Sequence, residues 1–178
     1  MAREIITHFH YIHHHGDSQR GFTLLELVFT VVIMGILIAM AAPSFNGLIE
    51  SNKVKRLATE IEWLLVQAKS EAVMRGGNIQ VVISAATPTW SIISSTVSGG
   101  VTLAEVSSVN FSNIELDKTF TSPKLVFDKL NGKPNLAGTY YYSIGDYKLN
   151  TVLYNKTGRI YTCLQDGSNK LSNYEFCK

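Results

Sequence analysis

An uninterrupted apolar run near the N-terminus constrains this chain more than any other feature. Residues 22–42 are FTLLELVFTVVIMGILIAMAA, and Glu26 is the only charged residue among them. A helix of this length is about 31 Å long, which matches the ~30 Å hydrocarbon core of a bilayer. Lipid offers the backbone no hydrogen bonds, so we expect a membrane-spanning helix. Pro43 follows at once, where it should kink or end the helix.

Two simpler explanations of this run compete with a functional one. A secretory signal peptide has a shorter apolar region and a small-residue cleavage site, which residues 40–43 match only faintly. A plain single-span anchor is the stronger alternative. A carboxylate inside an apolar span is costly and usually functional, so Glu26 favours a role beyond anchoring.

The segment after Pro43 predicts an amphipathic length of helix. Its apolar residues recur at the spacing of one helical face. They are Leu57, Ile61, Leu64, Leu65, Ala68 and Ala72. Gly76 and Gly77 then stop the helix. We expect residues 43–77 to continue the first helix into a folded head.

The remaining residues, 78–178, have β character. Seven segments rich in Val, Ile, Thr, Tyr and Trp alternate with turn signals. They are residues 79–84, 90–95, 101–106, 124–128, 139–144, 149–154 and 159–164. A long helix packed against an antiparallel β-sheet gives an α+β fold.

Both cysteines, Cys163 and Cys177, lie near the C-terminus. Close spacing after a membrane segment indicates one disulfide, formed in an oxidising compartment and closing a C-terminal loop. Two free buried thiols are the alternative.

The junction before the apolar run carries a resemblance to a known family. Gln19-Arg20-Gly21-Phe22-Thr23-Leu24-Leu25-Glu26-Leu27 resembles the processing site of type IV pilins and type II secretion pseudopilins. In that family a prepilin peptidase cuts after the glycine and methylates the new N-terminal amine. The resemblance implies cleavage between Gly21 and Phe22, removal of a leader at 1–21, and N-methylation of Phe22. It also matches Pro43 to the proline that kinks the family's long helix.

The same resemblance implies a pilin fold, a location and a set of partners. The chain would cross the bacterial inner membrane once at 22–42, with a periplasmic head, and then enter a pilus or pseudopilus filament. Its partners would be the prepilin peptidase, other major and minor pilins or pseudopilins, and the inner-membrane assembly platform.

Glu26 has a physical role in such a filament. It lies one helical turn from Phe22 and therefore faces the same side. Among packed apolar helices an unpaired carboxylate is expensive, and a neighbour's N-terminal amine would neutralise it. We expect Glu26 to make filament assembly depend on the axial register of the subunits.

The histidines argue against an enzyme. All five lie in the first 15 residues, inside the expected leader. His13, His14 and His15 are adjacent and share no helix face, so we expect no metal site. The mature chain would then contain no histidine, which excludes Ser-His-Asp and Cys-His catalysis. We expect neither catalysis nor a cofactor.

Residues 57–82, 90–93 and 155–160 resemble the GspH/FimT branch of the family. Some FimT-type minor pilins bind DNA with arginines at and after a late Gly-Arg pair, of which only Arg159 is present here. Lys156 and Lys170 are near in sequence, but acidic residues dilute them. A DNA site needs a basic stripe that neutralises several phosphates, so DNA binding is the less favoured hypothesis.

These observations predict a minor pilin or pseudopilin, a structural subunit placed at the filament tip or used in initiation. They do not choose cleanly between a type IV pilus and a type II secretion pseudopilus. Two alternatives come from other classes. One is a pilus-displayed DNA-binding subunit that uses Lys156, Arg159 and Lys170, and the other is an anchored periplasmic domain that never polymerises.

Overall fold

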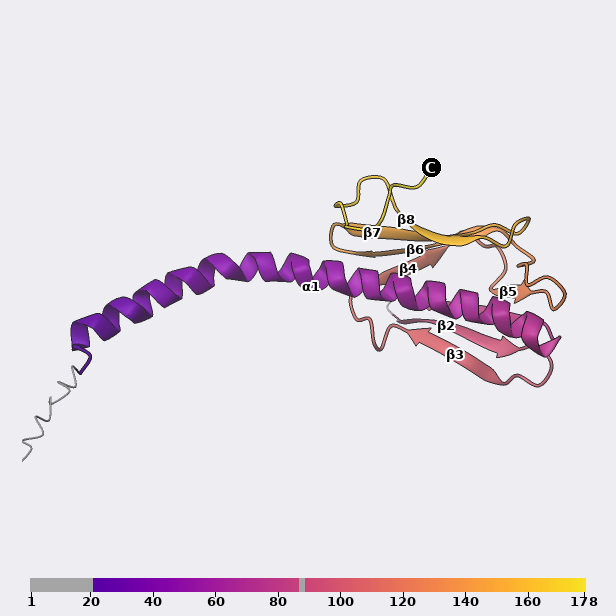
Figure 1. Cartoon of the computed structure of the whole chain (residues 1–178), viewed down its shortest axis with the longest axis horizontal. Coiled ribbons are helices and arrows are strands. Elements are labelled where there is room, and N and C mark those ends of the chain that lie inside the picture. The colour runs from indigo at the N-terminus through magenta and orange to yellow at the C-terminus, as the bar shows by residue number, and fades with distance from the viewer. Residues whose placement is uncertain (1–20, 87–88) are drawn as a thin grey trace, which may run out of the picture. The chain divides into compact units, whose positions relative to one another are not determined.

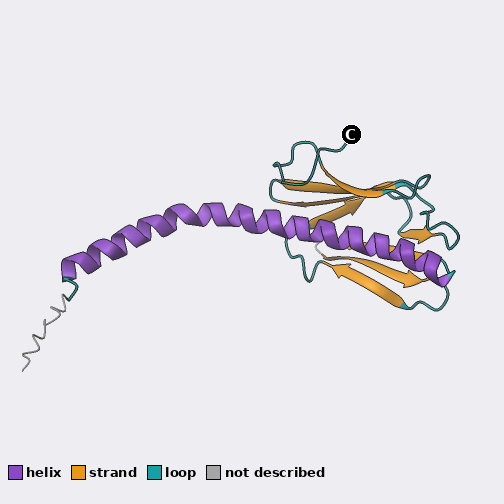
Figure 2. Ribbon diagram, viewed as in Figure 1, coloured by secondary structure: helices purple, strands orange, loops and turns teal. Residues whose placement is uncertain are grey.

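The computed structural model describes residues 21–86 and 89–178. Most of the expected leader, its histidines and the expected turn at 87–88 lie outside the described residues. The chain forms two compact units, Met1–Ala42 and Pro43–Lys178, which we describe separately. One helix, α1 (Leu24–Arg75), and eight strands make up the secondary structure of the described residues (Figures 1 and 2). Because α1 continues through position 43, the helix does not end at Pro43, and a kink there stays a prediction.

The head, Pro43–Lys178, contains two four-stranded antiparallel sheets. The first has the order β3-β2-β1-β5 and the second β4-β6-β7-β8. The bounds are β1 Ile79–Ala86, β2 Thr89–Thr96, β3 Thr102–Ser107, β4 Glu115–Lys118, β5 Lys124–Phe127, β6 Gly138–Ile144, β7 Tyr147–Leu153 and β8 Ile160–Leu164. The head half of α1 lies across both sheets (Figure 1). The α+β fold is confirmed, but the sheet expected from the sequence is divided into two.

The structure adds one strand, β4, that the sequence did not predict. Its residues Glu115, Leu116, Asp117 and Lys118 include three charges, which is unlike an ordinary strand. They pair with Ser143 through Tyr140 of β6. The strand therefore depends on pairing with β6, about two dozen residues later in the sequence. No local sequence pattern predicts β4.

The hydrophobic core forms where α1 meets the two sheets. The six predicted apolar residues of α1 are fully buried, together with Val54 and Ala58. The first sheet contributes side chains such as Val81, Ile92 and Phe127, and the second contributes others such as Tyr140, Leu149 and Leu164. This contact confirms the predicted apolar face of the helix.

Glycine ends the helix as the sequence predicted. Gly76 has φ +61°, a left-handed conformation that costs glycine little. Its N–H donates to the Val73 carbonyl at 3.3 Å, and the Gly77 N–H donates to the Ala72 carbonyl at 3.2 Å. These two bonds form a Schellman motif, which satisfies the last carbonyls and turns the chain toward β1.

A chain of polar groups joins α1 to the second sheet inside the head. The Tyr142 hydroxyl lies 2.9 Å from Thr151 Oγ1, which lies 3.1 Å from Thr162 Oγ1. The Thr162 hydroxyl donates to Glu62 Oε2 at 3.2 Å. Because buried polar groups are costly when unpaired, this chain favours one register of the helix on β6, β7 and β8.

The C-terminal segment is fastened to β8 by the predicted disulfide. Cys163 and Cys177 are bonded, with their Cα atoms 5.0 Å apart and a sequence separation of 14. The Cys177 N–H also donates to the Leu164 carbonyl at 2.9 Å, and Leu171 is buried in the core. The disulfide prediction is confirmed, and free thiols are excluded for this pair.

Candidate functional site

The expected cleavage site lies just before the start of α1. Residues 21–23 are not helical, and Phe22 is 75% exposed. Thr23 caps the helix, because the Glu26 N–H donates to Thr23 Oγ1 at 3.2 Å and the Leu27 N–H donates to the Thr23 carbonyl at 3.1 Å. The bond between Gly21 and Phe22 is therefore in exposed backbone outside the helix, where a peptidase can reach it.

Glu26 occupies the third position of the helix, and its spacing from Thr23 is that of a capping box. Its charge is next to the positive end of the helix dipole, which stabilises a carboxylate. Neither of the two ion pairs formed by the described residues includes Glu26. The carboxylate thus has a favourable backbone environment but remains available to an external cation. The sequence reasoning missed Thr23, although the Thr-Leu-Leu-Glu spacing could have revealed it.

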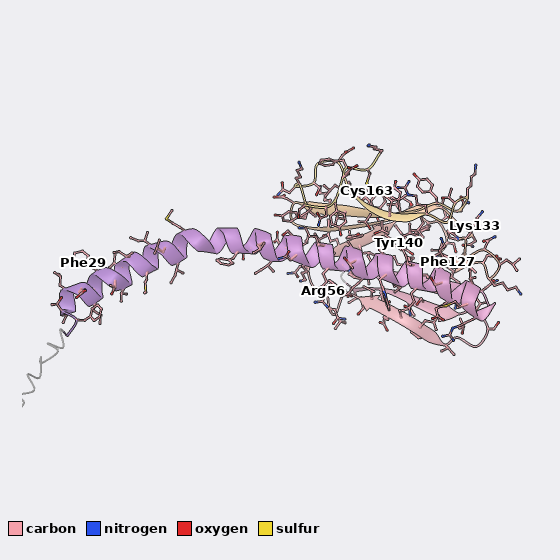
Figure 3. All side chains as sticks on the ribbon, viewed as in Figure 1. Phe29, Arg56, Phe127, Lys133, Tyr140 and Cys163 are labelled. Atoms are coloured by element: carbon pink, nitrogen blue, oxygen red, sulfur yellow. A yellow bond between two sulfur atoms is a disulfide. The ribbon has the colours of Figure 1, made fainter. Side chains whose placement is uncertain are left out.

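The apolar half of α1 offers a continuous hydrophobic surface. Every residue from 21 to 40 is exposed, including Phe29 at 59%, whose side chain projects from the helix (Figure 3). The Thr30 hydroxyl donates to the Leu27 carbonyl at 2.8 Å, so this polar group is satisfied within the helix. Glu26 is therefore the one charge that interrupts the surface from 22 to 40.

By length and hydropathy, no single helix of the described residues qualifies as a membrane span. One bent pair of helical segments, Leu24–Met40 and Phe45–Arg75, does qualify when the two are taken together.

The three basic residues considered for DNA binding, Lys156, Arg159 and Lys170, do not form one continuous basic stripe. Arg159 follows the turn between β7 and β8, where its guanidinium stacks on the Tyr161 ring at 4.7 Å from the centroid, and Lys156 is exposed in the same turn. Lys170 follows Asn169, whose N–H donates to the Asp146 carbonyl in the turn between β6 and β7. The two turns lie at opposite ends of β7, so Lys170 is separated from Arg159 by the length of that strand.

Two family models match the chain. Residues 16–42 match the prokaryotic N-terminal methylation motif, and residues 57–160 match type II transport protein GspH, which is more than half of the 178 residues. The chain belongs to the GspH family. The GspH match begins on the buried face of α1 and ends at Ile160, so the disulfide loop lies beyond it.

Curated relatives of this GspH-family chain are fimbrial proteins. A "Fimbrial protein" of Pseudomonas aeruginosa is 39% identical over 71 residues, which cover 40% of this chain and 44% of that protein. "Fimbrial protein Q" of Moraxella bovis is 32% identical over 95 residues, which cover 53% of this chain and 59% of that protein. The chain thus spans only about half the length of the curated relatives it matches.

Solved structures resemble the GspH-family head. The minor pseudopilin EpsH from the type II secretion system of Vibrio cholerae has a TM-score of 0.51 at 14% identity, covering 67% of this chain and 99% of that one. The type IV minor pilin FimU of Pseudomonas aeruginosa has a TM-score of 0.49 at 21% identity, covering 68% and 94%. The likeness to EpsH shows a shared fold, with a long helix on antiparallel sheets.

Proposed function

We propose that this chain is a minor pilin or pseudopilin, a structural subunit that is cleaved after Gly21, methylated on Phe22 and built into a filament through α1. One observation supports this most: the N-terminal methylation motif, residues 16–42, covers the exposed apolar half of α1, in which Glu26 is the only charge. Such a surface needs a lipid or protein environment, because exposed apolar side chains are unfavourable in water.

Maturation and assembly of the subunit proceed in three steps under this proposal. The chain is first anchored in the inner membrane by the apolar half of α1, with the head in the periplasm. Prepilin peptidase then removes residues 1–21 and methylates the new amine of Phe22. The assembly platform moves the subunit into a filament, where apolar helices of other pilins or pseudopilins replace lipid around residues 22–40.

Glu26 gives this assembly its register. Its carboxylate has no ion-pair partner within the described residues, while cleavage creates a cationic amine on each subunit. Pairing between Glu26 of one subunit and the amine of the next compensates both charges in an apolar surrounding. The role is structural and not catalytic, in keeping with a mature chain that lacks histidine.

Intact-mass and N-terminal analysis tests the proposal. The protein is purified from cells with and without prepilin peptidase, and a Gly21→Val variant serves as the uncleavable control. We expect loss of residues 1–21 and gain of one methyl group on Phe22 only when the peptidase is present and Gly21 is intact. An uncut chain, or one cut near Ala42, would contradict the proposal.

The filament system needs a separate test. Relatives with fimbrial names favour a type IV pilus, whereas the GspH match is equally compatible with type II secretion. Deleting the gene in its host and measuring both surface pili and secreted protein assigns the subunit to the process that fails.

A further inference from the structure

The two sheets of the head have four outer edges, of which two are protected and one is covered at one end. Over its four residues, β4 has three charges, which disfavour strand addition. The edge of β5 is covered by the following loop, since the Asn135 N–H donates to the Val126 carbonyl at 2.9 Å and Asn135 Oδ1 accepts from the Val126 N–H at 2.8 Å. One end of β8 pairs with the C-terminal segment through a parallel bridge between Leu164 and Phe176.

The fourth edge, β3, has no such cover. This strand is longer than β4 or β5, lies outermost in its sheet, and contains neither lysine nor proline (Figure 1). Glu105 is its only charged residue, and Glu105 and Thr102 are both exposed. A bulge near Leu103, where the pairing with Ser94 and Ser95 shifts, leaves the rest of the strand regular.

The hydrogen-bond pattern shows which backbone groups face outward. The Ser108 N–H donates to the Trp90 carbonyl at 2.9 Å, so this residue pair bonds across to β2. Antiparallel pairs alternate between bonded and non-bonded, and Glu105 is opposite Ile93 at a non-bonded position. The N–H and C=O of Glu105 therefore point to the free edge, and so does the Ser107 N–H.

Apolar side chains flank this edge at both ends. Val97 and Val101, in the hairpin before β3, are 49% and 57% exposed, and Val109, just after the strand, is 87% exposed. They offer contact area to a segment that pairs with β3, in addition to the backbone hydrogen bonds.

We propose that the free edge of β3 is a docking site for an extended strand from a different pilin-type subunit of the same filament. The incoming strand extends the first sheet to five strands and places a basic residue opposite Glu105. This inference rests on the proposed function, because it takes the partner to be another subunit anchored in the same membrane.

A second copy of this chain fits the edge poorly. In Figure 1, β3 extends along the direction of the head half of α1. Antiparallel pairing of two β3 edges would reverse one helix relative to the other, which is incompatible with insertion from the same side of one membrane. Parallel pairing keeps the helices aligned, but in a parallel ladder a residue with outward N–H and C=O lies opposite one whose groups point inward. Glu105 would therefore face residue 104 or 106 of the second copy, a one-residue shift that two-fold symmetry does not allow.

Photo-crosslinking of the full chain in its host tests the proposal. A benzophenone amino acid replaces Thr102 at the β3 edge, and a second probe replaces Leu37 in the exposed apolar helix as a positive control for assembly. Glu105→Pro removes the outward N–H without touching the bonds to β2, a change that edge strands tolerate. Glu105→Thr is the matched control, since it removes the charge but keeps the N–H.

We expect the Thr102 probe to capture another chain whose N-terminus carries a methylated phenylalanine. Glu105→Pro should lower that yield about tenfold, because a hydrogen bond and close approach are lost together. Glu105→Thr should change it by less than about threefold, the range of one cross-strand pair. Glu105→Lys, which reverses the charge, provides a second blocking variant if the proline variant does not accumulate.

Equal capture by wild type and both blocking variants, or capture of only a second copy, would overturn the inference. If the Leu37 probe captures pilin-type chains and the Thr102 probe captures none, the edge proposal alone fails. If Leu37 also captures none and Gly21–Phe22 is uncut, the proposed function fails and the docking proposal with it.

Discussion

At the scale of single residues, the charge of Glu26 is in a different environment in the isolated subunit and in the proposed filament. The N-terminus of α1 stabilises its negative charge, and the Thr23 cap holds its backbone in place. In the isolated subunit the side chain is exposed, so the helix N-terminus and the solvent are enough to stabilise its charge. In the proposed filament, where apolar helices surround it, the same charge needs a cation.

Replacing Glu26 by glutamine is expected to reduce filament incorporation. The substitution preserves size and helix propensity but leaves a neighbour's amine without a counter-charge, which costs several kcal/mol in an apolar setting and should lower incorporation by about tenfold or more. Immunoblots of sheared filaments measure the effect. Thr30→Val is the control, because the Thr30 hydroxyl donates to the Leu27 carbonyl of its own helix, and an equal loss in both variants would contradict the assigned role.

Gly132 is a residue whose importance comes from packing as well as conformation. Its φ is +62°, and a Cβ added there would lie 2.9 Å from Lys69 Cγ and 3.2 Å from the Lys69 carbonyl oxygen on α1. Gly100 has almost the same φ, +64°, but nothing lies within 4 Å of its Cβ position. Comparing alanine substitutions at the two glycines therefore separates the cost of backbone strain from the cost of steric overlap.

Gly132→Ala should lower the free energy of unfolding more than Gly100→Ala. We expect about 1–2 kcal/mol for the control from left-handed strain, and about 1–3 kcal/mol more at position 132 from overpacking against the helix. Denaturant unfolding of the mature chain in detergent, followed by circular dichroism, measures both. Equal effects would mean that the loop at 128–133 can move away from α1 at little cost.

At the scale of elements, the helix acts as the common support for the loops of the head. Lys53 Nζ donates to Ser112 Oγ at 3.0 Å, Lys55 Nζ to Ser172 Oγ at 3.1 Å, and Lys69 Nζ to the Gly158 carbonyl at 3.0 Å. The Arg56 guanidinium lies over the Phe111 ring, 5.2 Å from its centroid. The polar face of α1 thus holds the loop before β4, the turn between β7 and β8, and the C-terminal segment.

The disulfide has its effect at this scale too. Cys163→Ser with Cys177→Ser should lower the free energy of unfolding by about 3 kcal/mol, the chain-entropy value for a loop of roughly 15 residues. It should also expose the segment after β8 to proteases, since Leu164 keeps only its backbone bonds to that segment. Limited proteolysis with mass mapping checks this; unchanged resistance would show that the burial of Leu171 and the remaining hydrogen bonds are enough to hold the loop.

At the scale of the whole head, two buried tyrosines connect stability to pH. Burial raises the pKa of Tyr140 and Tyr142 above the ordinary value, and for Tyr142 the hydrogen bonds from Thr151 and Thr162 only partly oppose this. An acid with a raised folded-state pKa favours folding below its unfolded-state pKa. This contribution is lost as the pH rises above about 10, where tyrosine ionises in the unfolded chain.

We therefore expect the melting temperature of the head to fall as the pH rises above about 10. Tyr142→Phe should make the fall shallower, because one of the two most deeply buried tyrosine hydroxyls is gone. Tyr141→Phe, on the half-exposed opposite face of β6, should leave the slope unchanged. Thermal unfolding measured across alkaline pH distinguishes these outcomes, and identical slopes for all three proteins would exclude the linkage.

Local patterns in the sequence determined the membrane-length apolar run, the cleavage motif, the buried face of α1 and its glycine stop. Each of these depends on residues within a few helical turns, so spacing alone is informative. Seven strands were also predictable, with ends that differ by one or two residues from those observed. The pairing of Cys163 with Cys177 followed because the chain has no other cysteine.

Only the tertiary structure decided how the strands divide into two sheets and which edges remain free. Strand β4 exists because β6 pairs with it, and the contact of Thr162 with Glu62 joins residues 100 apart in sequence. The same arrangement separates Lys170 from Arg159 and leaves β3 open. These features depend on which segments far apart in the sequence pack together. The packing free energy of those contacts decides the arrangement, so it cannot be predicted from residue spacing along the chain.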